Sequence, residues 1–416
     1  FIVMYLVFLV AVKLSQPCIE IINVYLGWLF VEQFGKLLTL MSVPQWLIYF
    51  FSEILGGGLV TIGSFIPPIF FIYISLSILE DSGYMARAAF IADKFMRKIG
   101  LPGKAFIPLI VGFGCTVPAI MATRTLEKPR DRVFASILTP FISCGAKLPV
   151  YTYLVMLFFP QRADIVIFAL YFLGIIMGIL TGLLLKATIF KSAPGDFVME
   201  LPAYHIPTIN GIFMHTWHRL KSFLLRAGKT ILLVIVIINI LQVIQIPVGN
   251  KNEKTPLLEL GGKLITPVLQ PMGIKNDNWP ASVALISGLF AKEAIVGTLQ
   301  GLYQNSEDEG AIKHLTDNIK KGFGSNASVF AYLVFILLYS PCAAALTMLF
   351  KEHGFKWMLF DFGYLTVLAW MVATLVYQIL AFNALSIFWF AVIGVIFIII
   401  YINLRSIGSR YAIRAK

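Results

Sequence analysis

Residues 112–124 read Gly-Phe-Gly-Cys-Thr-Val-Pro-Ala-Ile-Met-Ala-Thr-Arg, and the rest of the chain is expected to be arranged around this segment. It is apolar enough to enter a bilayer, but its glycines weaken a helix, and Pro118 lacks the N–H that would pair with the carbonyl of Gly114. In lipid such a carbonyl is tolerated only where protein, water or an ion meets it. Cys115 lies beside it, so a soft sulfur ligand and a hard oxygen ligand are adjacent. The alternative is an ordinary kinked membrane helix with a packed, inert cysteine.

The composition predicts an all-α, polytopic membrane protein. Of the 416 residues 59% are hydrophobic and 13% are charged, and the mean hydropathy is +0.85. Apolar runs of about 20 residues, the length of a membrane-crossing helix, recur along the chain. We interpret the net charge of +12 as the positive-inside bias of membrane proteins and not as a sign of nucleic-acid binding. The four cysteines have no disulfide spacing and are predicted to be free thiols.

Apolar runs predict about eight membrane crossings, at residues 1–12, 59–79, 132–158, 163–186, 229–246, 281–303, 357–379 and 385–404. Two further apolar segments, 105–123 and 329–350, carry Cys–Pro motifs. If both enter the membrane and return on the same side, 24 of the 33 Lys and Arg residues face one side and 7 face the other. The positive-inside rule therefore favours eight crossings plus two broken or re-entrant segments.

The order of these features predicts two weak internal repeats, residues 1–190 and 229–416, joined by a cytosolic amphipathic linker at 191–228. In the first repeat a span ending in Glu80–Asp81 precedes the segment with Cys115. In the second, a span interrupted by Lys292–Glu293 precedes the segment with Pro341–Cys342. Because Pro341 also removes a helical partner, we expect the carbonyl of Leu337 to be free there, again close to a cysteine.

Ionisable residues within or beside the apolar runs are the other candidate site residues. A charge at the bilayer centre costs at least about 2.5–3.5 kcal/mol, so Lys292 and Glu293 are expected to face a cavity or to pair with other residues. Lys147 lies one helical turn from Cys144, where an ammonium would favour the thiolate form; a lysine that merely reaches towards the surface is the alternative.

Several motifs resemble, in the same order, those of the bacterial ferrous iron transport protein B family (FeoB). The most specific is residues 112–127, followed by Pro-Arg-Asp-Arg at 129–132, which is similar to the first Gate motif of that family. The others are Leu-Glu-Asp-Ser-Gly-Tyr-Met-Ala-Arg-Ala-Ala at 79–89, Ser-Cys-Gly-Ala-Lys-Leu-Pro-Val at 143–150, Glu-Leu-Pro-Ala-Tyr-His at 200–205, Ala-Lys-Glu at 291–293 and Ser-Pro-Cys at 340–342. The resemblance covers essentially the whole chain.

The resemblance implies a multi-pass protein of the bacterial inner membrane that imports Fe(II), with Gate segments related to those of nucleoside transporters. Members carry an N-terminal cytosolic GTPase domain, which is not in this chain. Because the chain begins at Phe1 and not at Met, we expect further sequence before it. The piece itself is then a transporter domain and not an enzyme. It would hold no permanent cofactor, would meet GTP only through the upstream domain, and would have the small partner protein A of the system as a possible contact.

In the family the cysteines that correspond to Cys115 and Cys342 are proposed to meet the ion. Ionisable and sulfur groups near the apolar runs are further candidates. The full set of predicted Fe(II) ligands is Cys115, Cys342, Glu80, Asp81, Met85, Cys144 and Glu293. The predicted pathway or structural residues are Gly114, Pro118, Pro341, Lys292 and Lys147. Mn(II) or Zn(II) selectivity stays open, as do a nucleoside-type symporter and a non-transporting membrane regulator of an upstream GTPase.

Overall fold

The computed structural model describes residues 14–15, 17–40, 44–191, 208–223, 225, 245–247, 254–303, 311–382 and 386–414. The chain forms two compact units, residues 1–90 with 198–245 and residues 91–197 with 246–416, and each is described by itself. The predicted span 1–12 and nearly all of 229–246 lie outside the described residues. Both cysteine segments, 105–123 and 329–350, are in the second unit.

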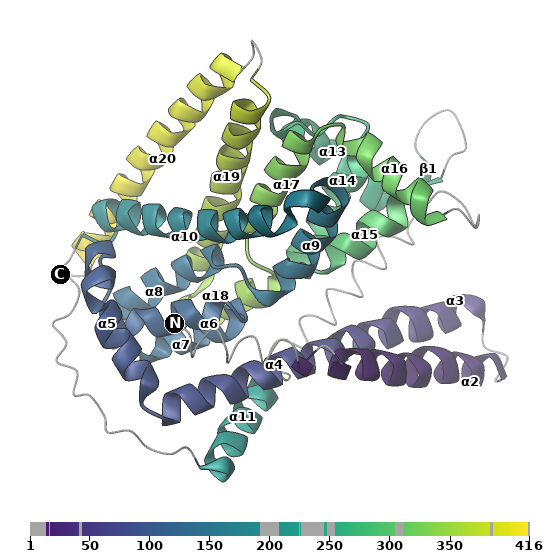
Figure 1. Cartoon of the computed structure of the whole chain (residues 1–416), viewed down its shortest axis with the longest axis horizontal. Helices are drawn as coiled ribbons and strands as arrows, with labels where there is room; N and C mark the ends of the chain where they lie inside the picture. Colours follow the sequence, from purple (N-terminus) through teal and green to yellow (C-terminus); the bar gives the residue numbers. More distant parts are fainter. Residues whose placement is uncertain are drawn as a thin grey trace. The chain divides into compact units, whose positions relative to one another are not determined.

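The first unit contains a helical hairpin followed by a long apolar helix. Its elements are η1 (Gly27–Gln33), α2 (Phe34–Leu40), α3 (Gln45–Ile48), η2 (Tyr49–Gly56), α4 (Gly57–Asp81), the start of α5 (Tyr84–Ile99) and α11 (Ile209–Phe223). The two arms of the hairpin lie side by side, with α2 against α3 (Figure 1). Helix α11 packs along α4 and buries Leu220, whereas Phe213 and Trp217 are exposed. Only part of the apolar face predicted for this linker is therefore covered by protein.

The second unit contains the broken helices. Its first part has η3 (Gly103–Ala105), α6 (Phe106–Gly112), α7 (Thr116–Ala122), η4 (Thr123–Thr125), α8 (Pro129–Leu138), η5 (Thr139–Phe141), η6 (Gly145–Lys147), α9 (Leu148–Phe158), η7 (Pro160–Arg162) and α10 (Ala163–Thr188). Its second part has α13 (Leu257–Leu269), η9 (Gln270–Met272), α14 (Trp279–Phe290), α15 (Ala294–Tyr303), α16 (Ala311–Phe323), α17 (Asn326–Leu338), α18 (Ala343–His353), α19 (Phe355–Leu380) and α20 (Ser386–Arg414). The strands of the described part are β1 (Gln245–Pro247) and β2 (Lys254–Pro256), which pair with each other.

The prediction of an all-α polytopic membrane protein is confirmed. Within the described residues, five helical stretches are long and apolar enough to cross a membrane: Pro129–Phe158, Pro160–Thr188, Asn326–His353, Phe355–Leu380 and Ser386–Gly408. Four of them coincide with predicted crossings. The fifth contains segment 329–350, which was expected to re-enter, and the predicted span 281–303 is divided into α14 and α15. The number of crossings stays a prediction.

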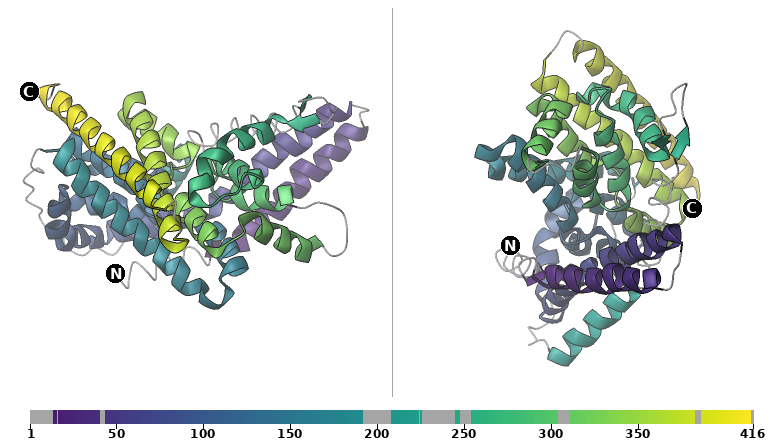
Figure 2. Two further views of the ribbon diagram at one scale, coloured as in Figure 1. Left: turned by 90° about the horizontal axis from the view of Figure 1, so that it is seen from above. Right: turned by 90° about the vertical axis from the view of Figure 1, so that its right-hand side faces the viewer.

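Helix α17 is the centre of the second unit, and almost all of its side chains are buried. Helix α19 packs along it, and α10 lies across α9, α17 and α20 (Figure 1). The last helix, α20, starts beside α19 and runs back to the end of α10, where Gly408 meets the backbone of Thr188 (Figure 2).

Glycine allows α10 to approach the break between α8 and α9. A Cβ atom at Gly174 would lie 2.6 Å from the carbonyl oxygen of Phe141 and 3.2 Å from a methyl of Leu337. One contact is with backbone in the α8–α9 break, and the other is with a side chain near the end of α17. Small residues at such contacts let membrane helices pack closely.

We therefore expect Gly174→Ala to destabilise the protein by about 1–3 kcal/mol, because the backbone oxygen of Phe141 has no room to withdraw. Gly394→Ala is the matched control, since no atom lies within 4 Å of a Cβ built there on α20. The measurement is the free energy of unfolding in detergent micelles. Equal stability of the two variants would contradict the close approach of α10.

Candidate metal-ion site

The first cysteine segment is broken just before Cys115. Helix α6 ends at Gly112, the chain turns through Phe113 and Gly114, and Cys115 is extended (φ −155°, ψ 135°) as the N-cap of α7. Pro118 falls in the first turn of α7, where a backbone N–H has no helical partner to lose. The expected break is present, but the residues around Gly114 produce it and Pro118 does not kink a continuous helix.

The carbonyl of Gly114, expected to be available to an ion, already has a protein partner. It accepts a hydrogen bond of 3.1 Å from the backbone N–H of Gly145, in the segment that joins α8 to α9. The break in one helix is therefore paired with the break in the next. This arrangement satisfies the rule that a freed carbonyl in an apolar region needs a donor.

The second cysteine segment has the same construction. Helix α17 ends at Leu338, residues 339–342 are extended or bent, and Cys342 (φ −62°, ψ 158°) is the N-cap of α18. The carbonyl of Leu337 is indeed without a helical partner, and the ammonium of Lys147 donates to it at 2.7 Å. Lys147 also donates to the carbonyl of Pro140 at 3.2 Å. Lys147 thus joins the α8–α9 break to the α17–α18 break.

A third break lies between α14 and α15, at Ala291–Lys292–Glu293. Lys292 is buried, and its ammonium donates to the carbonyl of Ser340 at 2.8 Å. The same ammonium lies over the ring of Tyr339, 3.1 Å from its centroid, which is a cation–π contact. The sequence analysis missed Tyr339, because an aromatic residue in an apolar run carries no signal of such a role.

These breaks bring four predicted ligands together. Cys115 is close enough to Cys342, Cys144 and Glu293 for electrostatic interaction with each of them. All four side chains are partly accessible, whereas Lys147 and Lys292 are buried. Within the described ranges no three His, Cys, Asp or Glu side chains are placed as a ready metal cage. The arrangement is a loose group of thiols and one carboxyl with two ammonium groups alongside.

Three of these ligands stand where a half-helix begins. The backbone N–H of Val117 points to the Cys115 thiol, and that of Ala345 points to the Cys342 thiol. Glu293 directly precedes α15. The start of a helix attracts negative charge, and broken membrane helices use such starts to build ion and substrate sites.

The remaining predicted ligands, Glu80, Asp81 and Met85, belong to the first unit and not to this group. Glu80 and Asp81 end α4, and Asp81 is partly accessible. Met85 is 4% exposed, so its thioether is packed in the protein. If the helix continued past Asp81, Glu80 would share a face with Tyr84 and Arg87. The helix instead turns at Gly83 (φ +73°), a conformation that favours glycine, and α5 begins afterwards.

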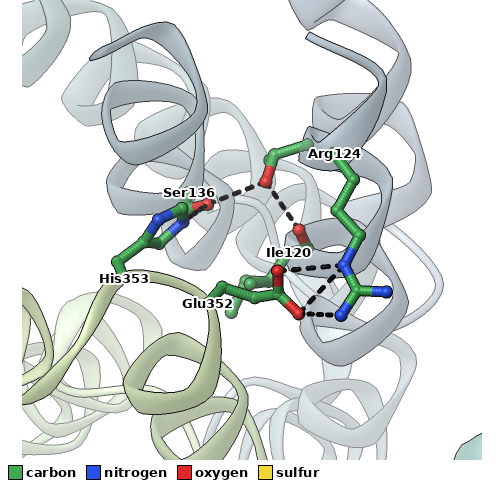
Figure 3. A network of polar contacts seen from close by, with 6 residues as sticks. Ile120, Arg124, Ser136, Glu352 and His353 are labelled. Carbon is green, nitrogen blue, oxygen red and sulfur yellow. Dashed lines mark hydrogen bonds and ion pairs between the residues drawn. The ribbon is translucent and has the colours of Figure 1, made fainter. Parts of the chain in front are cut away.

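A polar network joins the end of the first cysteine segment to the end of the second (Figure 3). Arg124 donates through Nε to both carboxylate oxygens of Glu352, at 2.9 and 3.0 Å, and through Nη2 to one of them. These hydrogen bonds raise the pKa of the Arg124 guanidinium. Ser136 lies 2.8 Å from Nε2 of His353 and 3.2 Å from the hydroxyl of Thr123, which donates to the carbonyl of Ile120. The network ties α7, η4 and α8 to the last turn of α18.

Asp361 is a second residue that the sequence analysis missed. It is fully buried in α19, and in the described part of the chain neither carboxyl oxygen has a hydrogen-bond partner. The signal was present, because Asp361 interrupts the apolar run 357–379 as Lys292 and Glu293 interrupt 281–303.

Comparisons with known proteins agree with the order of these segments. The Gate family model, described as nucleoside recognition, matches residues 62–158 and 224–356, and the model of the ferrous iron transport protein B C terminus matches residues 167–219. Curated relatives include the Fe(2+) transporters FeoB of Escherichia coli (strain K12), Shigella flexneri and Salmonella typhimurium. Each is 38% identical over 92% of this chain and 55% of its own length, so the chain spans about half of these relatives. No solved structure matches the chain.

Replacement of Lys147 tests whether the breaks depend on its ammonium. We expect Lys147→Met to destabilise the protein by about 1–3 kcal/mol for each buried carbonyl left without a donor, that is, for Leu337 and Pro140. Lys128→Met, at an exposed position, is the control and should change little. Thermal unfolding in detergent measures both, and a fully stable Lys147→Met variant would contradict the role of Lys147 as a donor.

The contribution of the Arg124–Glu352 pair is measurable by a double-mutant cycle. Because the Arg124 side chain is 50% exposed and that of Glu352 is 12% exposed, we expect a coupling of at most about 1 kcal/mol between Arg124→Ala and Glu352→Ala in the free energy of unfolding. The coupling should shrink in high salt. A coupling of zero at low salt would show that the pair does not hold the two segments together.

Proposed function

Because the chain belongs to the ferrous iron transport protein B family, we propose that its second unit forms a path for Fe(II) across the bacterial inner membrane. The observation that carries the proposal is the approach of Cys115, Cys144, Cys342 and Glu293 at the breaks of four helix pairs. The related Fe(2+) transporters give the substrate class. The proposed role is that of a transporter domain, with Fe(II) as the transported ion and no permanent cofactor.

The ligand types suit a transported Fe(II) ion. Fe(II) accepts thiolate, carboxylate and carbonyl ligands, and a transport site must bind weakly enough to release its ion. Thiols ionise when they bind a metal, so binding at Cys115 and Cys342 would release protons. The nearby ammonium groups of Lys147 and Lys292 offset the negative charge of the thiolates, so that the site carries little net negative charge.

Glu80, Asp81 and Met85 enter the proposal as further contacts for the cation. They stand at the end of α4 and the beginning of α5, and Asp81 is accessible enough to accept a hydrated ion. The packed thioether of Met85 would have to leave its present contacts to bind metal. Their contribution is therefore secondary to that of the cysteine group.

The rest of the system is proposed from the relatives, because this chain spans about half of their length. An upstream GTPase domain of the same polypeptide would couple GTP to the path, and the small partner protein A is a candidate cytosolic contact. The apolar helices place the chain in a lipid bilayer as a multi-pass protein.

Uptake by proteoliposomes tests the cysteine path. With Fe(II) kept reduced, we expect Cys115→Ser and Cys342→Ser each to raise the half-saturating Fe(II) concentration by about tenfold or more, since even outer-shell partners of metals cost roughly 10–100-fold when replaced. Cys18→Ser, in the first unit, is the matched control. Normal uptake by the double Cys115→Ser/Cys342→Ser variant would overturn the path.

The same vesicles separate the alternatives. Uptake of Mn(II) or Zn(II) in preference to Fe(II) would reassign the ion, and uptake of a radiolabelled nucleoside would indicate a symporter of the related Gate type. Absence of any uptake by the full-length protein with its GTPase domain, under conditions where GTP hydrolysis is normal, would indicate a non-transporting regulator.

A further inference from the structure

Asp361 lies in the second turn of α19, inside a stretch long and apolar enough to cross the membrane. It is 0% exposed, and neither carboxyl oxygen has a hydrogen-bond partner among the residues that the structure describes. A charge at the bilayer centre costs at least about 2.5–3.5 kcal/mol, and a carboxylate buried without a donor or counter-charge is costly wherever it lies in the protein. A carboxyl group is retained there only with something that neutralises it.

The neighbouring polar groups are engaged elsewhere. Tyr364, one turn along α19, is the titratable group of the described chain that interacts electrostatically with Asp361, and its hydroxyl donates to Thr181 of α10 at 3.3 Å. Several charged and titratable side chains of the helices near α19 bond elsewhere. Lys186 of α10 donates to the carbonyls of Arg97 and Lys98, Tyr332 of α17 to the carbonyl of Ala281, and Tyr339 to the carbonyl of Leu285. On α18, Glu352 pairs with Arg124 and His353 with Ser136, while Lys351 of α18 and Arg405 of α20 are exposed. None of these supplies a counter-charge to Asp361.

The chemistry of the surroundings selects the ligand. A metal cation needs several oxygen, nitrogen or sulfur ligands, and Asp361 belongs to no such group in the described residues. A proton, unlike a metal ion, needs no further ligand. It is therefore the partner that best suits a fully buried carboxyl with no hydrogen-bond donor and no neighbouring acid. The neutral acid fits an apolar interface between helices, and the ionised acid does not.

The position of Asp361 connects this proton to the second cysteine segment. Helix α19 follows α18 through Gly354 (φ +85°), and it packs along both α17 and α18, the two halves that flank Cys342. Loss of the proton would place a charge on the buried face of α19. That charge would have to reach water or a cation, which we expect to require a movement of α19 and so of the helices packed along it.

We propose that Asp361 is a proton-binding site, and that its carboxylate takes up one proton from water on one side of the membrane and returns it on the other as the second cysteine segment moves. This inference rests on the proposed transport function. The step is a simple protonation, in which the carboxylate oxygen gains a proton and later gives it back, so that it needs no other reactant. Fe(II) uptake is then accompanied by the movement of a proton on Asp361, in addition to the protons that the cysteines release.

The first test is independent of transport. Infrared spectra of the protein in lipid near pH 7 should contain a carbonyl band of a protonated carboxylic acid that Asp361→Asn removes. Asp164→Asn is the matched control, because Asp164 is an exposed acid at the start of α10 and its replacement should leave the band in place. If Asp361→Asn removes no such band, the carboxyl is ionised and the proposal is overturned, whether or not the vesicles take up Fe(II).

The second test uses the full-length protein in vesicles with a pH-sensitive dye inside. For wild type we expect proton movement to accompany Fe(II) uptake, and the rate to change by up to about tenfold per pH unit across the titration, as one proton requires. Asp361→Asn, which keeps the size of the side chain, should lose the proton movement and the pH dependence that Asp361 contributes and keep those of the Cys115 and Cys342 thiols, which still set the Fe(II) affinity.

If Asp361→Asn fails to fold, Asp361→Leu serves as a second neutral variant of similar volume, and its unfolding curve reports whether the site is intact. A wild-type pH profile and proton movement in either folded variant would overturn the proposal. Lack of Fe(II) uptake by wild type would instead refute the proposed function, and the infrared band would still decide whether Asp361 holds a proton.

Discussion

The second unit depends on donors for backbone carbonyls that broken helices leave without partners. In an apolar interior each such carbonyl would cost about 1–3 kcal/mol if it stayed unpaired. Gly145 meets the carbonyl of Gly114, Lys147 meets that of Leu337, and Lys292 meets that of Ser340. Each donor comes from another break, so the breaks at Gly114 and at Leu337–Ser340 rely on other breaks for their hydrogen-bond partners. The helix ends are therefore coupled to one another by hydrogen bonds and not only by packing.

This coupling changes what the ion is expected to meet. A lysine ammonium occupies the carbonyl of Leu337, where the proline pattern had suggested an ion contact. The side chains that remain accessible are the thiols and Glu293. A divalent ion in this region would also be repelled by two ammonium groups, so ionised thiols are needed to balance the charge. At the proposed site, binding of Fe(II) and loss of the thiol protons would therefore be linked by electrostatics alone.

The sequence was sufficient for the helical class, four of the five described stretches able to cross a membrane, and the breaks near Cys115 and Cys342. It was not sufficient for the partners of the carbonyls, because Lys147 and Leu337 are 190 positions apart and no local pattern relates them. Pro118 misled for a local reason: a proline in the first turn of a helix does not disturb it. Asp361 was predictable by the rule already applied to Lys292, that a charge within an apolar run has a purpose.

The order of the breaks also favours a different correspondence between the two parts of the second unit. Each part has two successive broken pairs, α6/α7 and α8/α9 in one, and α14/α15 and α17/α18 in the other. In this order Phe-Gly-Cys at 113–115 corresponds to Phe-Ala-Lys at 290–292, and Cys144 corresponds to Cys342, whereas the sequence alone had paired Cys115 with Cys342. The parts are then chemically unlike at their first break, since one offers a thiol and the other a lysine with a carboxyl. If Fe(II) passes between the two parts as proposed, it would meet sulfur on one side and a lysine followed by a carboxyl on the other. Such asymmetry would give the two directions along the proposed path different electrostatic barriers, which a path between two identical halves would lack.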